Sequence, residues 1–177
     1  MTGNFVPGTP ISALFSIRRR RLRAKIQIVQ QDPTDTFDPR RTLAWSLGEP
    51  FRIHRQSSER QVNIAVQELV ERVGLDATLL DSRPAEVTPS NLQRFAIARA
   101  LATDPMIILD DQRLFSPYDR ESLLQLLGDL QRALSLSYLF ISRPAFSHRR
   151  MRASCNHAER TNNGEWANGI DFLQPRQ

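Results

Sequence analysis

The sequence has little lysine, glycine and cysteine, and each shortage excludes a kind of site. It contains one lysine, Lys25, and seven glycines among 177 residues. A phosphate-binding loop of the form G-x-x-x-x-G-K-[ST] needs a lysine to reach the phosphates and glycines to bring backbone N–H groups close to them. Lys25 is followed by Ile26 and the nearest glycine before it is Gly8, so the sequence holds no such loop. The single Cys155 excludes an internal disulfide and a zinc site built on paired cysteines.

Long apolar segments and a secretion signal are also missing. No run approaches the roughly 18 to 20 apolar residues that a membrane span needs, and the first residues lack the basic-then-apolar order of a signal peptide. We therefore expect a cytoplasmic protein. The net charge is +5, carried almost wholly by arginine. The basic runs at 18–23 and 148–152 are either solvated surface or a salt-sensitive, non-specific binding surface for nucleic acid. No RNA-binding or zinc motif accompanies them, and a basic nucleic-acid binder is kept as one alternative function.

Apolar periodicity predicts alternating strands and helices. Strands are expected at 25–29, 106–109 and 137–142, and helices at 42–47, 57–74, 88–103 and 120–134. The clearest helix has a capping box of Ser58 and Gln61 and a terminal Gly74. Its apolar residues fall on one face, which should be buried: Val62, Ala65, Val66, Leu69, Val70 and Val73. A helix between two buried strands requires a right-handed crossover and a parallel sheet, so the predicted fold class is α/β. Beyond Pro144 the periodicity is lost, and an irregular tail is expected.

Polar residues follow each predicted strand. Gln31 follows the first, Asp110 and Asp111 the second, and Arg143 the third. In open parallel sheets, ligands bind beyond the carboxyl ends of the strands. An aspartate there can hold Mg²⁺, and a second carboxylate can orient a water that attacks a phosphate. By itself the aspartate pair fits helix capping or loop hydrogen bonding equally well. Arg143 is either a solvated residue or a partner for one of the aspartates.

Several blocks occur together in a recognisable order. They are "IQIVQQDPTDTFDPRRTL", "VQELVERVGL", "QRFAIARALATDPMIILDD" and "LLGDLQRALSLSYLFIS". This order resembles the ATP-binding subunit of ABC transporters, and within them the oligopeptide/dipeptide importer group, which includes the peptide-resistance importers. The resemblance covers residues 20–143. It implies a partial P-loop NTPase-like core with parallel strands plus a helical subdomain.

The resemblance assigns roles to the polar residues at the strand ends. Gln31 falls on the Q-loop glutamine, which contacts Mg²⁺ and the attacking water. Asp110 falls on the Walker B aspartate, a metal ligand. Asp111 stands in place of the catalytic glutamate and is one methylene shorter, and Arg143 stands where the family has its switch histidine. The implied cofactors are ATP and Mg²⁺.

The signature motif of the family is altered. "VTPSNLQR", residues 87–94, stands where the family has LSGGQ, so Thr88, Ser90 and Asn91 would face the nucleotide. Thr88 resembles the signature serine, but both glycines are gone. The phosphate loop, Walker A, has no counterpart. We therefore expect an amino-terminally truncated, degenerate relative in which ATP binding or hydrolysis is impaired.

The resemblance also implies a domain plan and partners. A single ABC-like domain over 1–177 would comprise an N-terminal segment with the Q-loop strand (1–30), a helical subdomain (31–103), the Walker B and switch core (104–145) and an irregular tail (146–177). The partners would be ABC permease subunits and a second ATP-binding subunit, with attachment to the inner face of the cell membrane through the permease. Trp45 and Phe51 lie in the segment that faces the permease in the family. They either pack in the core or form an apolar dock. A non-hydrolysing interaction protein is the main alternative to an importer ATPase.

Overall fold

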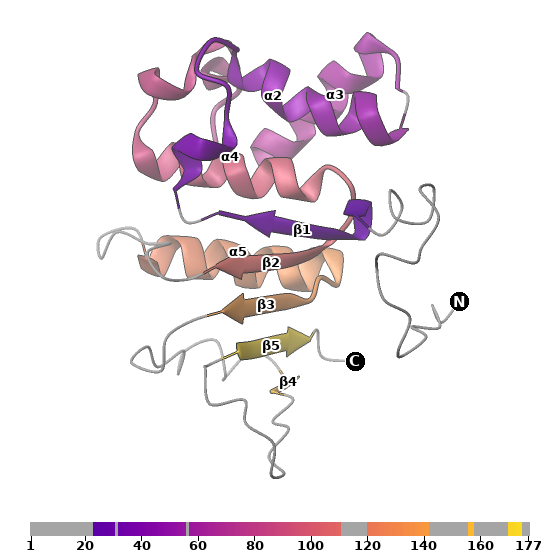
Figure 1. Ribbon diagram of the computed structural model, residues 1–177, viewed down its shortest axis with the longest axis vertical. Helices are drawn as coiled ribbons and strands as arrows, with labels where there is room; N and C mark the ends of the chain where they lie inside the picture. The colour runs from indigo at the N-terminus through magenta and orange to yellow at the C-terminus, as the bar shows by residue number, and fades with distance from the viewer. Residues whose placement is uncertain are drawn as a thin grey trace.

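The computed structural model describes residues 23–30, 32–55, 57–110, 120–141, 156–157 and 170–174. Within these residues a sheet of five strands has the order β1-β2-β3-β5-β4 (Figure 1). Strands β1 (Ile26–Val29), β2 (Met106–Asp110) and β3 (Tyr138–Ile141) are parallel. The parallel sheet and the α/β class predicted from the sequence are confirmed.

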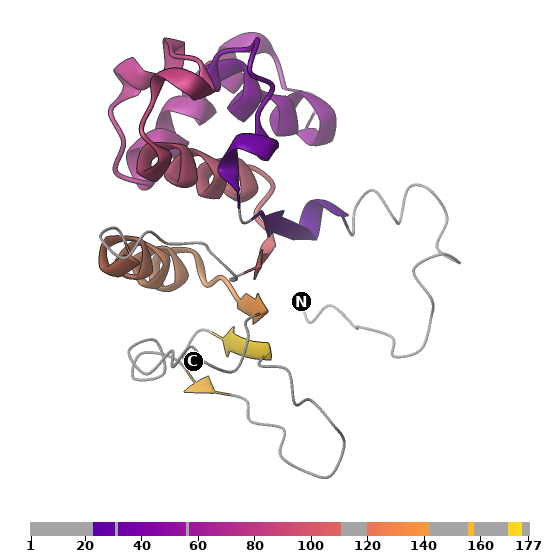
Figure 2. The same ribbon diagram turned by 60° about the vertical axis from the view of Figure 1, so that its left-hand side comes forward.

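The chain between β1 and β2 forms a helical layer. It contains the short turns η2 (Pro33–Thr36), η3 (Phe51–Arg55), η4 (Ala77–Asp81) and η5 (Pro84–Glu86), and the helices α2 (Leu43–Pro50), α3 (Glu59–Arg72) and α4 (Pro89–Leu101). In Figures 1 and 2 this helical layer lies next to β1, on the side away from β2, and α4 is the helix that runs closest to β1. Helix α5 (Arg120–Leu134) connects β2 to β3 and lies on one face of the sheet (Figure 2). Each predicted helix is present, with slightly different bounds.

Local signals explain where α3 begins and ends. The Ser58 amide donates to Gln61 Oε1 at 3.0 Å, as the capping box predicts. Gly74 follows the helix with a φ of +68°, a left-handed conformation that favours glycine. The predicted apolar face is buried except for Ala65, which packs partly buried against the core. Helices α4 and α5 complete this core with Leu92, Phe95, Ile97, Leu123, Leu127 and Leu130.

The prediction of an irregular tail is wrong for two short strands. Strand β5 (Ile170–Gln174) pairs antiparallel with β3, and β4 (Asn156–His157) pairs with β5. The register places Leu173 opposite Tyr138 and Ile170 opposite Ile141. A five-residue segment is too short for a clear periodicity, and its partner strand lies far back in the sequence. An antiparallel edge strand on a parallel sheet is common.

Two departures from the predicted elements lie near β1. The loop expected after β1 contains the 3-10 turn η2, which Asp32 caps by accepting a hydrogen bond from the Thr34 amide at 2.9 Å. After Pro50 the chain continues into the wide π-type turn η3 instead of ending the helix. Such turns often occur at functional sites. Over the described residues, no helix has the length and low charge needed to cross a membrane.

Candidate functional site

The carboxyl ends of the parallel strands meet at one edge of the sheet. Val29 ends β1 opposite Leu109, and Asp110 ends β2 opposite Ile141, the last residue of β3. The backbone therefore brings together the strand ends at which the sequence places its polar residues. Three of the predicted site residues, Gln31, Asp111 and Arg143, lie outside the described residues. The roles assigned to these three and to Asp110 stay predictions.

The remaining predicted site residues form the first turn of α4. Thr88 is the N-cap, and its Oγ1 accepts a hydrogen bond from the Asn91 amide at 3.2 Å. Thr88 is exposed, and Ser90 and Asn91 are half-buried. Helix α4 runs opposite to β2, so its N-terminal turn faces the same side of the molecule as the strand ends (Figure 1). The structure thus gives Thr88 a capping role that explains the residue without a ligand.

This turn fits a phosphate poorly. A helix N-terminus binds anions through free backbone N–H groups and its dipole. Here Pro89 has no N–H, and the Asn91 N–H is engaged by Thr88 Oγ1. The glycines that would let a phosphate approach closely are absent from residues 87–94. Within the described part of the chain, no group of three acidic, histidine or cysteine side chains could hold a metal ion.

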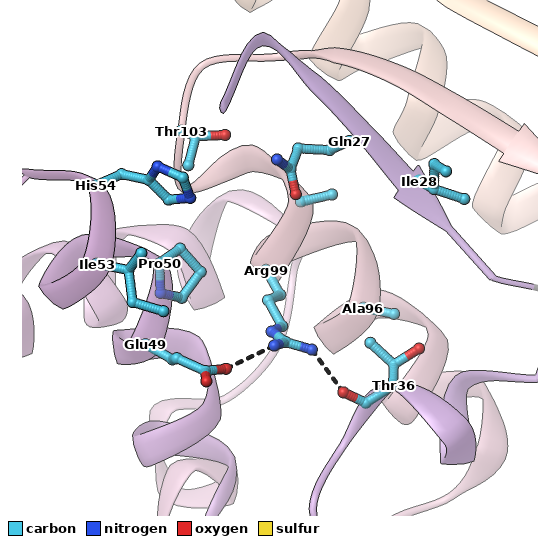
Figure 3. A pocket seen from close by; sticks show the side chains of 11 residues that line it. Gln27, Ile28, Thr36, Glu49, Pro50, Ile53, His54, Ala96, Arg99 and Thr103 are labelled. Carbon is cyan, nitrogen blue, oxygen red and sulfur yellow. Dashed lines mark hydrogen bonds and ion pairs between the residues drawn. The ribbon is translucent and has the colours of Figure 1, made fainter. Parts of the chain in front are cut away.

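A cleft of about 270 Å³, which the sequence did not indicate, lies between β1, η2, α2, η3 and α4 (Figure 3). Its lining residues are Gln27, Ile28, Thr36, Glu49, Pro50, Ile53, His54, Ala96, Arg99, Ala100 and Thr103. Two large apolar side chains on its wall are open to solvent, since Ile28 is 62% exposed and Ile53 is 45% exposed. Pro50 precedes the wide turn that carries Ile53 and His54 to the cleft. Covering these two side chains with a partner surface would remove apolar area from water, which is favourable.

Arg99 connects three elements at this cleft. Its NH1 donates to the Thr36 carbonyl oxygen at 2.5 Å, and its NH2 donates to Glu49 Oε2 at 2.6 Å (Figure 3). The guanidinium therefore joins α4 to η2 and to α2. At the end of α4, Thr103 Oγ1 donates to the Ala24 carbonyl at 2.6 Å, which ties the helix to the chain just before β1. These contacts join residues that are far apart in sequence, so no local pattern could have shown them.

The two aromatic residues of the α2 region have different environments. Phe51 is 4% exposed and belongs to the core, which confirms core packing for this residue. Trp45 is 37% exposed, and the Arg41 guanidinium lies 4.8 Å from its ring centroid. Trp45 thus remains on the surface of α2, the helix that also carries Glu49.

Charged contacts hold the turn after α2. Arg52 Nε donates to Glu59 Oε1 at 2.9 Å and its NH2 donates to Oε2 at 3.0 Å, while NH1 donates to the Trp45 carbonyl at 3.2 Å. The hydrogen bond from Arg52 lowers the pKa of Glu59, and the same bond raises the pKa of Arg52. In η2, the hydroxyl and then the amide of Thr34 lower the pKa of Asp32. In both contacts the hydrogen bonds favour the ionised side chains.

Comparisons with known proteins place these features in context. A family model described as "ABC transporter" matches residues 4–113, which extends further toward the N-terminus than the motif blocks of the sequence. The glutathione import ATP-binding protein GsiA of Salmonella paratyphi A is 39% identical over 138 residues, which are 76% of this chain and 22% of GsiA. The oligopeptide transport ATP-binding protein AppF of Bacillus subtilis is 38% identical over 127 residues, which are 70% of this chain and 38% of AppF. The chain therefore spans well under half the length of these relatives.

Solved structures with a similar fold are ATP-binding cassettes. CbiO1 of Clostridium perfringens, part of the transporter complex cbiONQ, superposes with a TM-score of 0.62 at 22% identity, covering 71% of this chain and 50% of that one. The dimeric cassette MJ0796 bound to ADP and Pi superposes with a TM-score of 0.56 at 21% identity, covering 72% and 63%. At these identities the likeness shows a shared fold.

Proposed function

The chain belongs to the ABC transporter family, and from this we propose that it acts as the ATP-binding subunit of a peptide-type importer, with impaired nucleotide binding. The family and the P-loop NTPase fold implied by the sequence are confirmed. The observation that carries the proposal is the 38–39% identity to relatives named for glutathione import and oligopeptide transport. We extend to this chain the substrate class those names share, which is peptides. Substrate choice would lie with other subunits of the importer.

Impaired nucleotide binding is supported by the donor groups that the chain offers. The sequence has no G-x-x-x-x-G-K-[ST] loop, and the first turn of α4 offers fewer N–H groups than a glycine-rich turn would. In the proposed site, Asp110 and Gln31 would hold Mg²⁺, and Thr88, Ser90 and Asn91 would face the nucleotide. Asp111 would orient the attacking water and Arg143 would stand at the switch position. The shorter side chain of Asp111 would place its carboxylate further from that water, and a displacement on the order of 1 Å can cost about a hundredfold in rate.

The cleft supports a second part of the proposal, a docking site for a permease subunit. Ile28 and Ile53 are exposed on its wall, and Trp45 is exposed on the adjoining helix. Tryptophan is enriched at protein interfaces, and burying exposed aliphatic side chains against a partner is favourable. Through this contact the chain would attach to the inner face of the cell membrane, beside a second ATP-binding subunit.

The same cleft favours the alternative of a non-hydrolysing interaction partner. This alternative keeps the docking surface and dispenses with nucleotide chemistry. It differs from the first proposal in one measurable property, ATP binding, and its partner would be either a permease or a competent ATP-binding subunit. The alternative of a basic nucleic-acid binder stays a prediction, because the basic runs 18–23 and 148–152 on which it depends lie, except for Arg23, outside the described residues.

Docking is tested by co-purification with the permease subunits of a peptide-type importer, co-expressed and solubilised in detergent. Ile53→Glu places a charge on the wall of the cleft and should abolish capture. Ile64→Glu is the matched control, because Ile64 is 50% exposed on α3 and does not line the cleft. If wild type captures no permease, or if both variants are captured as well as wild type, the docking proposal is wrong.

A further inference from the structure

We propose that Arg99 is a positioning residue that sets the placement of the turn η2 (Pro33–Thr36) and thereby the width of the cleft. This inference rests on the proposed docking function. The turn η2 is the first described element after β1, at the start of the helical layer. Its end is joined to α4 by the hydrogen bond from Arg99 NH1 to the Thr36 carbonyl, at 2.5 Å.

The Thr36 carbonyl lies at the end of η2, where a helix leaves its last acceptors without partners inside the helix. The hydroxyl of the same residue cannot anchor the segment, because Thr36 Oγ1 is buried without a hydrogen-bond partner in the described chain. The Arg99 bond thus satisfies the Thr36 carbonyl at this end of η2. Losing it would leave a second polar atom of Thr36 unsatisfied.

The second hydrogen bond of Arg99 pairs its positive charge with the carboxylate of Glu49. Glu49 Oε2 accepts from NH2 at 2.6 Å, and the two side chains are 28% and 33% exposed. Thr36, Glu49 and Arg99 all line the cleft (Figure 3). An occupant of the cleft would therefore lie against the group that fixes η2 relative to α2.

The arrangement needs an arginine. A guanidinium presents several N–H groups in a fixed planar fork, so one side chain reaches a carbonyl on one element and a carboxylate on another. A lysine ammonium is a single point charge and can satisfy one of these acceptors at the observed geometry, but not both. Arg99→Lys should therefore keep the charge and release η2.

The chain offers a matched control on the same helix. Arg94 NH1 donates to the Val73 carbonyl at 2.7 Å, and its NH2 donates to Ser122 Oγ at 2.6 Å. Arg94→Lys thus removes the same kind of paired contact, but between α4, the end of α3 and α5. If Arg99 only stabilised the fold, Arg99→Lys and Arg94→Lys would have the same effect on η2 and on docking.

The test combines amide hydrogen exchange in the isolated chain with permease capture. The reporter is the Phe37 amide, which donates to the Thr34 carbonyl of η2 at 3.4 Å. We expect Arg99→Lys to accelerate exchange at Phe37 about tenfold or more and to weaken capture by a similar factor. Arg94→Lys should leave both readouts at the wild-type value.

The possible failures can be told apart. Unchanged Phe37 exchange in Arg99→Lys overturns the positioning role. So does faster exchange with wild-type capture, or an equal effect of Arg94→Lys on both readouts. A wild-type chain that captures no permease refutes the proposed docking, and this inference falls with it.

Discussion

Two glycines in the middle of helices should respond differently to alanine, because only one of them has room for a Cβ. Alanine is the better helix former by about 1 kcal/mol, so the substitution stabilises a helix when nothing else changes. At Gly128 in α5, an added Cβ would have no neighbouring atom within 4 Å. At Gly48 in α2, the Cβ would lie 2.8 Å from Val62 Cγ1 and 2.8 Å from Arg52 NH1. The two sites therefore separate helix propensity from packing between helices.

The cost at Gly48 follows from what would have to move. Val62 is 1% exposed in the core, and Arg52 is held by its ion pair with Glu59. Overpacking of this kind costs roughly 1–3 kcal/mol, which exceeds or cancels the gain in helix propensity. We expect Gly48→Ala to destabilise by about 0–2 kcal/mol and Gly128→Ala to stabilise by about 1 kcal/mol.

Urea unfolding of the two variants beside wild type measures this difference. The urea midpoint of Gly128→Ala should rise, and that of Gly48→Ala should fall or stay at the wild-type value. The dependence of the unfolding free energy on urea concentration should be the same in all three proteins. If Gly48→Ala stabilises the chain as much as Gly128→Ala does, then α2 and α3 do not pack as closely as described. Because α2 carries Glu49, such a result would also weaken the account of the cleft.

Two further predictions concern the backbone and pH. Ser135 has a φ of +53°, a left-handed conformation that costs a non-glycine residue about 1 kcal/mol. Ser135→Gly should therefore raise the midpoint of urea unfolding. A lower midpoint would contradict the left-handed conformation of this residue. The pKa of Asp32 is lowered from its usual 3.8 in the folded chain, so its stabilising effect is present above that pH and is lost as the pH falls through the lowered value. Between about pH 6 and about pH 2, the unfolding temperature of Asp32→Asn should fall less steeply than that of wild type. If the unfolding temperatures of the two proteins fall in parallel, the Thr34 contacts do not stabilise the folded chain.

Features specified by local chemistry could be predicted from the sequence. Ser58 and Gln61 begin α3, Gly74 ends it, and the Thr88-Pro89 pair begins α4, because caps act within a few residues. The short apolar run at β2 could be recognised as a strand because it lies between two helical patterns. These elements in turn required parallel strands, and the structure confirms them.

Features specified by distant contacts could not be predicted. Strand β5 exists because β3 has an edge to pair with, and a five-residue segment carries little pattern of its own. The cleft depends on Arg99 meeting Thr36 and Glu49, which lie far from it in the sequence. Nothing in the sequence alone distinguished buried Phe51 from exposed Trp45, since both are aromatic residues and only six positions separate them.

The most direct test of the central claim is Mg-ATP binding by the purified chain, measured by calorimetry at millimolar nucleotide. Bacillus subtilis AppF would be measured in parallel, and Asp110→Asn would serve as the site control. We predict that the folded chain binds at least about a hundredfold more weakly than AppF, since this sequence has neither the phosphate loop nor the glycine-rich turn. Saturable binding of similar affinity to AppF, lost in Asp110→Asn, would contradict impaired nucleotide binding and make the chain a competent ATP-binding subunit.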